Sequence, residues 1–280
     1  MTTNPATLRV GVIGMGRVGP AVASALRANG HNIVAVNAHS AAAAERADTM
    51  LPGVPQTTAE AVVKDSDLVI LAVPDGAIAP TAAQLQPHFR PGQVVVHLSG
   101  AHGEELLAPA AERGAVTAAI HPAMTFTGTS LDVSRLAGAP AAVTAAPLFL
   151  PVAHALATEI GLVPQSVPAA TKPLYHAALV HASNHLVTVV AQASDLLAQA
   201  GVPNPGEYLR PLLQASLEGA LEGGMGALTG PVMRGDSETV QKHKEALAGT
   251  SAAEAYSALS SATGDEWAQY QSRLNTDLLD

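Results

Sequence analysis

The sequence predicts a doubly wound α/β domain that is followed by an all-α domain. Up to about residue 145, short apolar runs typical of buried strands alternate with segments of helical character. The strand runs are continuously apolar, which is typical of a parallel sheet covered by helices on both faces. From about residue 168 onward no run predicts a strand. We therefore expect two domains, residues 1–166 and residues 167–280.

Each expected element follows from local pattern and from helix or strand breakers. The expected strands are residues 8–13, 32–37, 67–73, 94–98, 116–120 and 141–144. The helices expected between them are residues 20–28, 41–50, 58–64, 76–85 and 103–113. Helices of the second domain are expected over residues 173–200, 205–219, 237–248, 252–262 and 265–279. Glycine and proline at the ends of these runs, such as Gly30 and Pro205, mark where helices stop and start.

Composition limits the classes of function. Hydrophobic residues make up 48% of the 280 residues and charged residues 13%, which favours a large buried core over disorder. The net charge of −9 and the scattered Lys and Arg residues offer no basic stripe for a nucleic acid. The absence of cysteine excludes disulfides, thiolate catalysis and cysteine-based zinc sites. The start of the chain lacks the pattern of a signal peptide, so we expect a cytoplasmic protein without a membrane segment.

The strongest motif is the run Gly14-Met15-Gly16-Arg17-Val18-Gly19, which follows the first strand and opens the first helix. In this context the first glycine permits a tight turn, the second lets a pyrophosphate approach the backbone, and the third lets helix and strand pack closely. Amides at the start of the helix would then face the phosphates. The motif predicts a Rossmann domain that binds a dinucleotide. The alternative is that the glycines serve only the turn.

The end of the second strand bears on the choice between NAD and NADP. NAD sites usually place a carboxylate there to hold the ribose 2′-hydroxyl group. In this sequence no carboxylate follows the strand before Glu45, whereas His39 and Ser40 do. Arg17 of the glycine run and Arg46 of the next helix are further candidates. These residues favour the 2′-phosphate of NADP(H) as the ligand. The alternative is that His39 and Ser40 only cap the next helix.

Other candidate residues follow the carboxyl ends of later strands, where cofactors lie in such sheets. Val73, Pro74, Ser99 and Gly100 are candidates for the cofactor, and His121 for the substrate. His97 falls inside a strand, so we expect it to be a core residue.

A possible catalytic face occurs at the start of the long helix expected from residue 173. Lys172, His176 and Asn184 are separated by multiples of four and share one helix face. Hydride transfer to a carbonyl creates negative charge on oxygen, which such side chains can protonate or stabilise. The alternative is a solvated lysine and a hydrogen-bonded core histidine. His181 and His185 lie on another face without an acidic partner, and no metal site is expected.

The second segment of interest is the Gly/Pro-containing loop over residues 227–236. Arg234 in this loop could hold a substrate carboxylate through a bidentate contact. The alternative is a structural turn in which Arg234 pairs with Asp236.

Several stretches together resemble a known group of proteins. They are GVIGMGRVG, LAVPD, HLSG, IHPAMTF, KPLYHAALVHASNHLV and ALTGPVMRGDSETVQKH. Nearly the whole chain resembles the bacterial Rossmann-like proteins with a helical second domain of formerly unknown function. These belong to the larger 6-phosphogluconate-dehydrogenase-like group, and some members are similar to an alternative ketopantoate reductase. The resemblance implies a homodimer formed through the helical domains.

One position departs from the pattern of these reductases. Ketopantoate reductases and β-hydroxyacid dehydrogenases typically place an asparagine four residues after the catalytic lysine, where this chain has His176. The first asparagine after Lys172 is Asn184. The leading hypothesis is an NADPH-dependent reductase of a small 2-oxo acid. The alternatives are an imine reductase of the pyrroline-5-carboxylate type and a non-catalytic protein that senses NADP.

Overall fold

The computed structural model describes residues 7–277 of the chain. The chain forms two compact units that divide between Val180 and His181, inside the long helix α8 (Lys172–Gln199). The last strand of the first unit ends earlier, at Ser166. The domain boundary expected between residues 166 and 167 stays a prediction.

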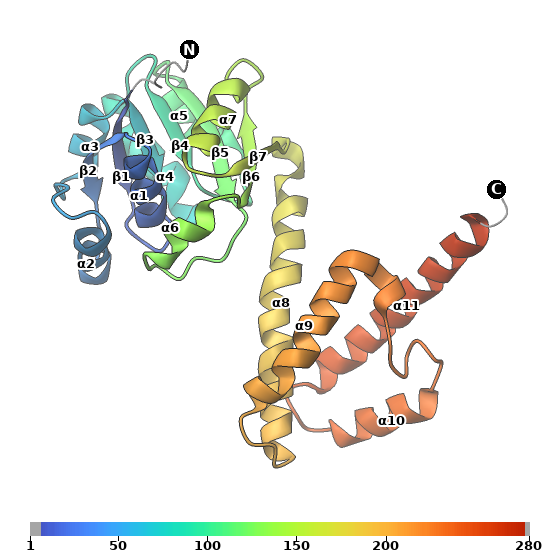
Figure 1. Ribbon diagram of the computed structural model, residues 1–280. Helices are drawn as coiled ribbons and strands as arrows, with labels where there is room; N and C mark the ends of the chain where they lie inside the picture. The colour runs from blue at the N-terminus through green and yellow to red at the C-terminus, as the bar shows by residue number, and fades with distance from the viewer. Residues whose placement is uncertain (1–6, 278–280) are drawn as a thin grey trace. The chain divides into compact units, whose positions relative to one another are not determined.

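The first unit is built on a seven-stranded sheet with the order β2-β1-β3-β4-β5-β6-β7 (Figure 1). The strands are β1 (Arg9–Ile13), β2 (Asn32–Asn37), β3 (Leu68–Leu71), β4 (Val94–His97), β5 (Val116–Pro122), β6 (Pro140–Ala145) and β7 (Val163–Ser166). All six expected strands are present, and β7 was not expected. The first five strands are mutually parallel, so their carboxyl ends meet at one edge of the sheet.

The parallel arrangement does not extend to the whole sheet. Strand β6 is antiparallel to β5, and β7 pairs with β6 in parallel. A parallel crossover usually needs a full helix packed on the sheet. Here the connection contains only the short helix α6 (Leu131–Leu136), which contacts helix α1. The chain therefore returns in the opposite direction, and the expected parallel sheet is confirmed except at the pairing of β5 with β6.

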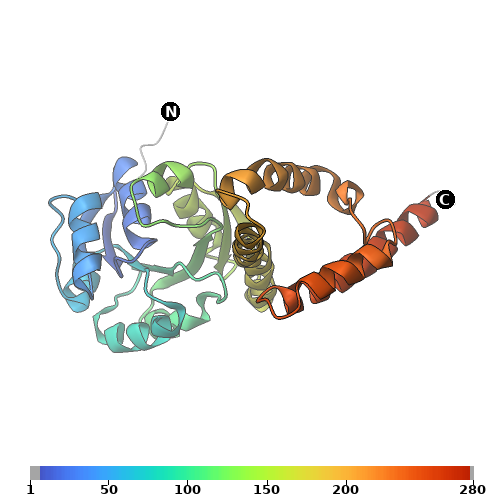
Figure 2. The same ribbon diagram turned by 90° about the horizontal axis from the view of Figure 1, so that it is seen from below.

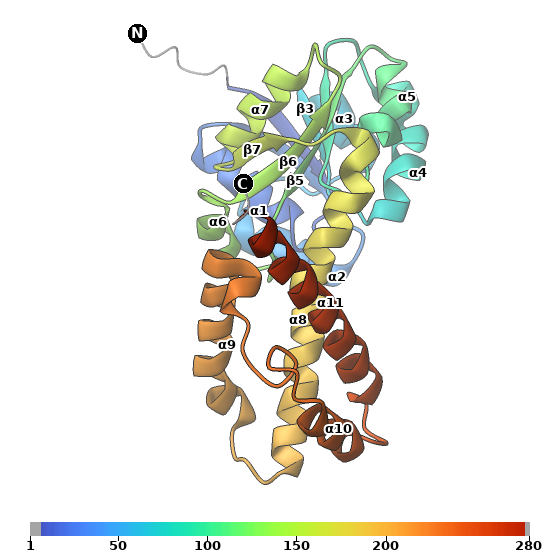
Figure 3. The ribbon, with the colours of Figure 1, turned by 90° about the vertical axis from the view of Figure 1, so that its right-hand side faces the viewer.

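Helices cover both faces of the sheet (Figure 3). They are α1 (Gly19–Ala28), α2 (Ala41–Met50), α3 (Ala59–Asp65), α4 (Asp75–Leu85), α5 (Ala108–Ala111), α6 and α7 (Leu150–Glu159), with short 3-10 helices η1 (Gln86–His88), η2 (Glu104–Leu107) and η3 (Ala169–Thr171). Strand β3 explains the double covering. Leu68 and Ile70 enter one core cluster with α1 and α7, while Val69 and Leu71 enter the other with α3 and α4. Alternate side chains of a strand point to opposite faces, so a strand buried on both sides is apolar throughout.

The helix expected over residues 103–113 is divided in the structure. Its first part is the 3-10 helix η2, and α5 begins only at Ala108. Pro109 has no backbone N–H and is tolerated in the first turn of a helix but not in its interior. A new helix start at Ala108 therefore accommodates this proline.

The second unit is helical and is drawn in yellow to red in Figure 2. After the later part of α8 it contains α9 (Pro205–Gly223), the 3-10 helix η4 (Gly224–Ala227), α10 (Ser237–Ala246) and α11 (Ala253–Asp277). The two helices expected over residues 252–262 and 265–279 are one helix, and the expected residues 278 and 279 lie outside the described part. A single glycine costs a helix only about 1 kcal/mol, so Gly264 does not end α11.

In the described residues, 7–277, each helix is either too short or too polar to span a lipid bilayer.

Gly11 of β1 provides a test of how closely α3 packs on the sheet. A Cβ atom at Gly11 would collide with Ser66 Oγ and lie 2.5 Å from Val62 Cγ1. We expect Gly11→Ala to lower the free energy of unfolding by about 1–3 kcal/mol, because the helix must shift. The control is Gly76→Ala in α4, where no atom lies within 4 Å of the added Cβ. Urea denaturation followed by circular dichroism compares the two, and equal stabilities would contradict this packing.

Candidate functional site

The loop after β1 needs glycine at its first position. Gly14 has a φ of +100°, and a Cβ atom there would lie 2.5 Å from the carbonyl oxygen of Ala72. Its backbone N–H donates to the carbonyl oxygen of Asn37 at 3.0 Å, which ties the loop to the end of β2. Only glycine adopts this conformation in so little space. The predicted tight turn is therefore confirmed.

The second and third glycines of the motif have the two environments that the motif predicts. Gly16 is exposed, and no atom lies within 4 Å of a Cβ placed there. A Cβ at Gly19 would collide with the carbonyl oxygen of Gly14, so this glycine allows α1 to pack against the loop. Between them Met15 is buried and Val18 partly buried, which anchors the loop to the core.

The start of helix α1 is suited to an anion. Its N-cap residue is Val18, whose side chain makes no capping hydrogen bond, and Pro20 occupies the first turn. Backbone amides at a helix start that lack a side-chain cap are available to a phosphate, and the helix dipole favours the negative charge. Together with the open side of Gly16, this geometry fits the pyrophosphate of a dinucleotide.

Residues near the end of β2 add donors and one unused acceptor. Asn37 donates through Nδ2 to the carbonyl oxygen of Thr57 at 2.7 Å, while its buried Oδ1 has no hydrogen-bond partner among the described residues. Asn37 occupies the strand end where NAD sites usually carry an acid. This position, which sequence reasoning passed over, gives a bound ribose a neutral hydrogen-bonding partner.

The residues predicted for the 2′-phosphate lie directly after β2, in α2 and on the glycine loop. His39 and Ser40 are exposed, and Ser40 caps α2 because its Oγ accepts from the backbone N–H of Ala43 at 3.2 Å. The capping role that the sequence left open is therefore present for Ser40. Arg46 donates through Nη1 to the carbonyl oxygen of Met15 at 2.9 Å, and Arg17 is exposed on the glycine loop.

The carboxyl end of β4 is shaped by His97. Nε2 of His97 lies 2.7 Å from the carbonyl oxygen of Gly103, and Nδ1 accepts from the backbone N–H of Ser99 at 3.1 Å. One ring nitrogen must donate and the other accept, so the ring is neutral with its proton on Nε2. Burial lowers the pKa of His97, which is consistent with this state. The expectation that His97 is a core residue is confirmed.

Lys172 at the start of α8 is completely buried. Its Nζ donates to the carbonyl oxygen of Ser99 at 3.0 Å and lies 5.6 Å from the centre of the Tyr175 ring. Burial lowers the pKa of Lys172 to about 8, although the carboxylates of Glu105 and Asp75 partly oppose this. Within the described part of the chain no carboxylate forms an ion pair with Lys172. Buried lysines are nearly always paired, so this one is a candidate for function.

Two histidines and a tyrosine lie beside Lys172. Nδ1 of His121 lies 3.0 Å from the Tyr175 hydroxyl group, and the rings of His121 and His176 meet edge to face at 6.1 Å between centroids. A Cβ at Gly100 would lie 2.7 Å from His176 Cδ2 and 2.9 Å from His121 Nε2. Only glycine therefore fits between the two imidazoles.

The electrostatics of this group favour a neutral His121 ring and a protonated Tyr175 hydroxyl group. Burial first, and then the charge of Lys172, lowers the pKa of His121 to about 4. Burial raises the pKa of the Tyr175 hydroxyl group. Near neutral pH the group therefore combines one buried ammonium with a neutral imidazole and a protonated phenol, which can all donate hydrogen bonds.

We call this group the Lys172 cluster. It consists of Ser99, Gly100, His121, Lys172, Tyr175 and His176. Five of these residues were singled out in the sequence. Lys172 and His176 were expected to be catalytic, and Ser99, Gly100 and His121 follow strand ends. Tyr175 was not predicted from the sequence, although it lies about one helical turn after Lys172. Val73 lies beside the glycine loop, where its backbone nitrogen is 2.9 Å from a Cβ placed at Gly14, and the exposed Pro74 precedes α4.

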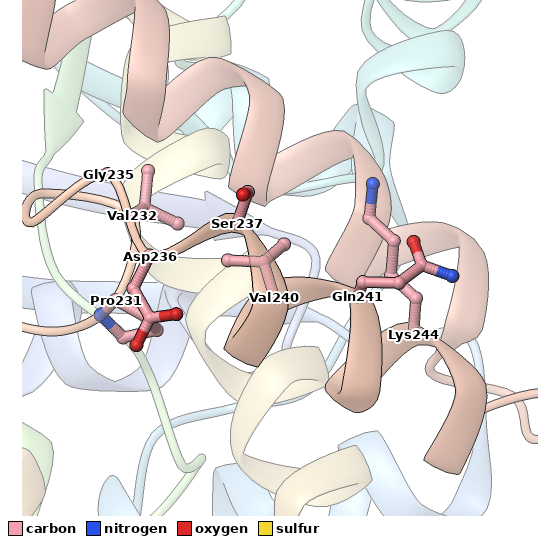
Figure 4. Close-up of a pocket in the computed structure, with 8 residues that line it drawn as sticks. All are labelled: Pro231, Val232, Gly235, Asp236, Ser237, Val240, Gln241 and Lys244. Atoms are coloured by element: carbon pink, nitrogen blue, oxygen red, sulfur yellow. The ribbon is translucent and has the colours of Figure 1, made fainter.

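Asn184 and Arg234 belong to the second unit, and their relation to the cluster stays a prediction. Both side chains are exposed, and the Oδ1 atom of Asn184 accepts from Ser183 Oγ at 3.1 Å. A small cavity of about 350 Å³ lies at the start of α10, and its lining includes Val232 and Gly235 but not Arg234 (Figure 4). Asp236, which lines this cavity, caps α10 by accepting from the backbone N–H of Thr239 at 3.0 Å. The ion pairs of the described residues do not include the alternative pair Arg234–Asp236.

Sheet order and glycine loop together define the first unit as a Rossmann-like domain. Comparison with family models agrees, because residues 2–122 match the model of a Rossmann-like domain. Residues 139–263 match the model of a domain of unknown function, DUF2520. The chain thus carries a Rossmann-like domain followed by a DUF2520 domain, which confirms the resemblance inferred from the motifs.

Solved structures support the fold over nearly the full length. A protein from Bacteroides fragilis, provisionally named an NADP oxidoreductase, has a TM-score of 0.78 at 20% identity, over 92% of this chain and 98% of its own. An imine reductase from Aspergillus terreus, in complex with NADPH4 and a dibenzazepine, has a TM-score of 0.64 at 21% identity, over 95% of both chains. An NADH-preferring ketol-acid reductoisomerase from an uncultured archaeon has a TM-score of 0.62 at 15% identity, over 99% of this chain and 90% of its own. No curated protein sequence matches the chain.

The environment of His121 can be tested by titration. We expect nuclear magnetic resonance of the histidine rings to give a pKa of about 4 for His121, because burial and the Lys172 charge both oppose protonation. Lys172→Met should raise this pKa, since one positive charge is lost. The control is Lys64→Met, which removes an exposed charge from α3. A His121 pKa that is equal in both variants would contradict the cluster.

Proposed function

We propose that the protein is an NADPH-dependent reductase of a small 2-oxo acid, with a reaction similar to that of ketopantoate reductase. The observation that carries the proposal is the completely buried Lys172, whose ammonium group is held by the Ser99 carbonyl oxygen directly after β4. The open glycine loop follows β1 of the same sheet. An acid is thereby fixed at the sheet edge where a dinucleotide would lie.

The cofactor part of the proposal rests on the loop and on the end of β2. The amides of residues 16–19 would bind the pyrophosphate, and Arg17, Arg46, His39 and Ser40 would bind the 2′-phosphate. Val73, Pro74, Ser99 and Gly100 would flank the cofactor further along the sheet edge. The similar imine reductase was solved with a form of NADPH, which supports the same assignment. When bound, NADPH supplies a hydride.

The remaining chemistry is assigned to side chains of this chain. Lys172 has a pKa of about 8 and is therefore mostly protonated near pH 7. One of its three N–H groups is used by Ser99, so the others can donate to a substrate carbonyl oxygen and then protonate it. His121 would hold the substrate beside Gly100, and His176 would assist Lys172. The catalytic role of Asn184 and the substrate contact of Arg234 stay predictions from the sequence.

A second candidate is the reduction of an imine, as in the pyrroline-5-carboxylate type of reductase. The negative charge near Lys172 favours this candidate. The carboxylates of Glu105 and Asp75 lie close enough to Lys172 to raise its pKa against the effect of burial. Negative charge near the site would stabilise a protonated imine more than a neutral carbonyl. The third possibility, a protein that senses NADP, requires binding without turnover.

We also infer that two copies pair through their helical domains. Large apolar side chains are exposed on the helices of the second unit, including Val187 of α8 at 69%, and Leu212 and Leu221 of α9 at 64% and 79%. Exposed apolar area of this kind is typical of a protein interface. Sedimentation or light scattering of the purified chain measures the oligomeric state.

Dinucleotide binding is tested at the second glycine of the loop. We expect Gly16→Val to raise the dissociation constant for NADPH by about 10-fold or more, because side-chain atoms would occupy the phosphate position. Since no atom lies within 4 Å of that Cβ, thermal stability should not change. Gly206→Val is the control, because Gly206 is equally open at the start of α9. Fluorescence titration gives both affinities, and a wild-type protein that binds neither NADPH nor NADH would refute the proposal.

Catalysis is tested at Lys172. We expect Lys172→Met to reduce kcat/KM by about 10²- to 10⁴-fold while NADPH affinity is kept, because the proton donor is lost. In the wild type, kcat should fall as the pH rises through about 8, where Lys172 loses its proton. Oxidation of NADPH is followed spectroscopically with ketopantoate, with other 2-oxo acids and with cyclic imines. Lys64→Met is the control, and equal turnover in both variants would contradict the catalytic role of Lys172. NADPH binding by the wild type without turnover of any of these substrates would leave only the binding-protein alternative.

A further inference from the structure

We propose that Asp132 is a positioning residue of the dinucleotide site, which holds residues 127–129 against Arg17 and Arg46 so that both guanidinium groups face the 2′-phosphate. The inference rests on the proposed binding of NADP(H). It adds a residue more than 80 positions from either arginine in sequence. None of the motifs in the sequence indicated it.

Asp132 is completely buried in α6, and its carboxylate collects donors from one loop. The backbone N–H of Thr127 donates to Oδ1 at 3.1 Å and to Oδ2 at 2.9 Å, and its hydroxyl group donates to Oδ1 at 2.9 Å. The backbone N–H groups of Gly128 and Thr129 donate to Oδ2 at 2.7 Å and 3.4 Å. Arg135 lies on the other side, with Nη1 3.9 Å from Oδ1.

These contacts keep the carboxylate ionised and the loop fixed. Burial alone would raise the pKa of Asp132, but the hydrogen bonds from Thr127, Gly128 and Thr129 together outweigh it, and the pKa is lowered. Hydrogen bonds to a charged acceptor are stronger than those to a neutral one. Three consecutive residues of the loop are thus bound to one side chain.

The fixed loop lies directly on the two arginines. Gly128 has a φ of +79°, and a Cβ atom there would lie 3.1 Å from Arg17 Cγ and 3.2 Å from Arg46 Nε. Arg46 in turn donates to the carbonyl oxygen of Met15 in the glycine loop. The carboxylate, residues 127–129, both guanidinium stems and the phosphate loop therefore form one continuous set of contacts.

This arrangement reduces the cost of binding a phosphate. A free arginine side chain loses about 1.5–2 kcal/mol of rotamer entropy when it is ordered. Here the loop restricts both arginine stems before any ligand binds, which is preorganisation. Since the two guanidinium groups are assigned to the 2′-phosphate, the benefit should apply to NADPH and much less to NADH.

The test compares two variants with a matched control. Asp132→Asn replaces one acceptor oxygen by an NH₂ group that faces the loop's own donors. Gly128→Ala leaves the carboxylate intact and pushes the loop away from Arg17. Gly138→Ala is the control, because Gly138 has a similar φ of +81° but no atom lies within 4 Å of its Cβ position. Dissociation constants for NADPH and NADH are measured for each protein, together with thermal stability.

We expect both variants to weaken NADPH binding by about 10-fold and NADH binding by less than about 2-fold, because the phosphate contacts are charge-assisted. The control should keep the wild-type ratio of the two constants. Unchanged NADPH affinity, or equal losses for both dinucleotides, would overturn the inference, since a purely structural role does not distinguish them. If Asp132→Asn does not fold, the inference is tested by the ratio of the NADPH and NADH dissociation constants in Gly128→Ala, compared with the ratio in Gly138→Ala. A wild type without affinity for either dinucleotide refutes the proposed function itself, before any variant is measured.

Discussion

The hydrogen bond from Lys172 Nζ to the Ser99 carbonyl oxygen is the contact on which the candidate site depends. Removal of an ammonium group from water costs several kcal/mol, and here a single carbonyl, an aromatic ring and more distant carboxylates offset that cost. The bond fixes the start of α8 at the carboxyl end of β4. One helical turn later, Tyr175 and His176 reach His121 and Gly100. If Lys172 faced solvent, the start of α8 would lose this anchor, and Tyr175 and His176 would not be held at His121 and Gly100.

Much of this could be predicted because the signals are local. A strand covered on both faces is apolar at every position, so a run such as Leu68–Leu71 can be recognised in the sequence. The roles of Gly14, Gly16 and Gly19 follow from the lack of a side chain. The shared helix face of Lys172 and His176 follows from helical periodicity, and both indeed lie in the cluster.

The parts that could not be predicted depend on distant residues or weak patterns. Strand β7 reads Val-Pro-Gln-Ser, and only one of its four residues is even partly buried, so it has no apolar period. The reversal of β6 accompanies a contact of α6 with α1 that joins distant residues. Helix α11 continues through Gly264 because no strong breaker follows. The contact of His121 with Tyr175 spans 54 residues, and no local pattern records it. Asp132 resembles any acid in a first helical turn until its loop partners are seen.

The imidazole of His97 joins two backbone groups, since it donates to the carbonyl of Gly103 and accepts from the amide of Ser99. A proton added to Nδ1 would turn that acceptor into a donor that faces another donor. The residue pushed away would be Ser99, whose own carbonyl oxygen holds the buried ammonium group. Acid would therefore weaken the hydrogen bond between the Ser99 carbonyl oxygen and Lys172 without altering the charge of Lys172. The buried ring of His97 thus sets a lower limit to the pH at which the hydrogen bond between Ser99 and Lys172 persists.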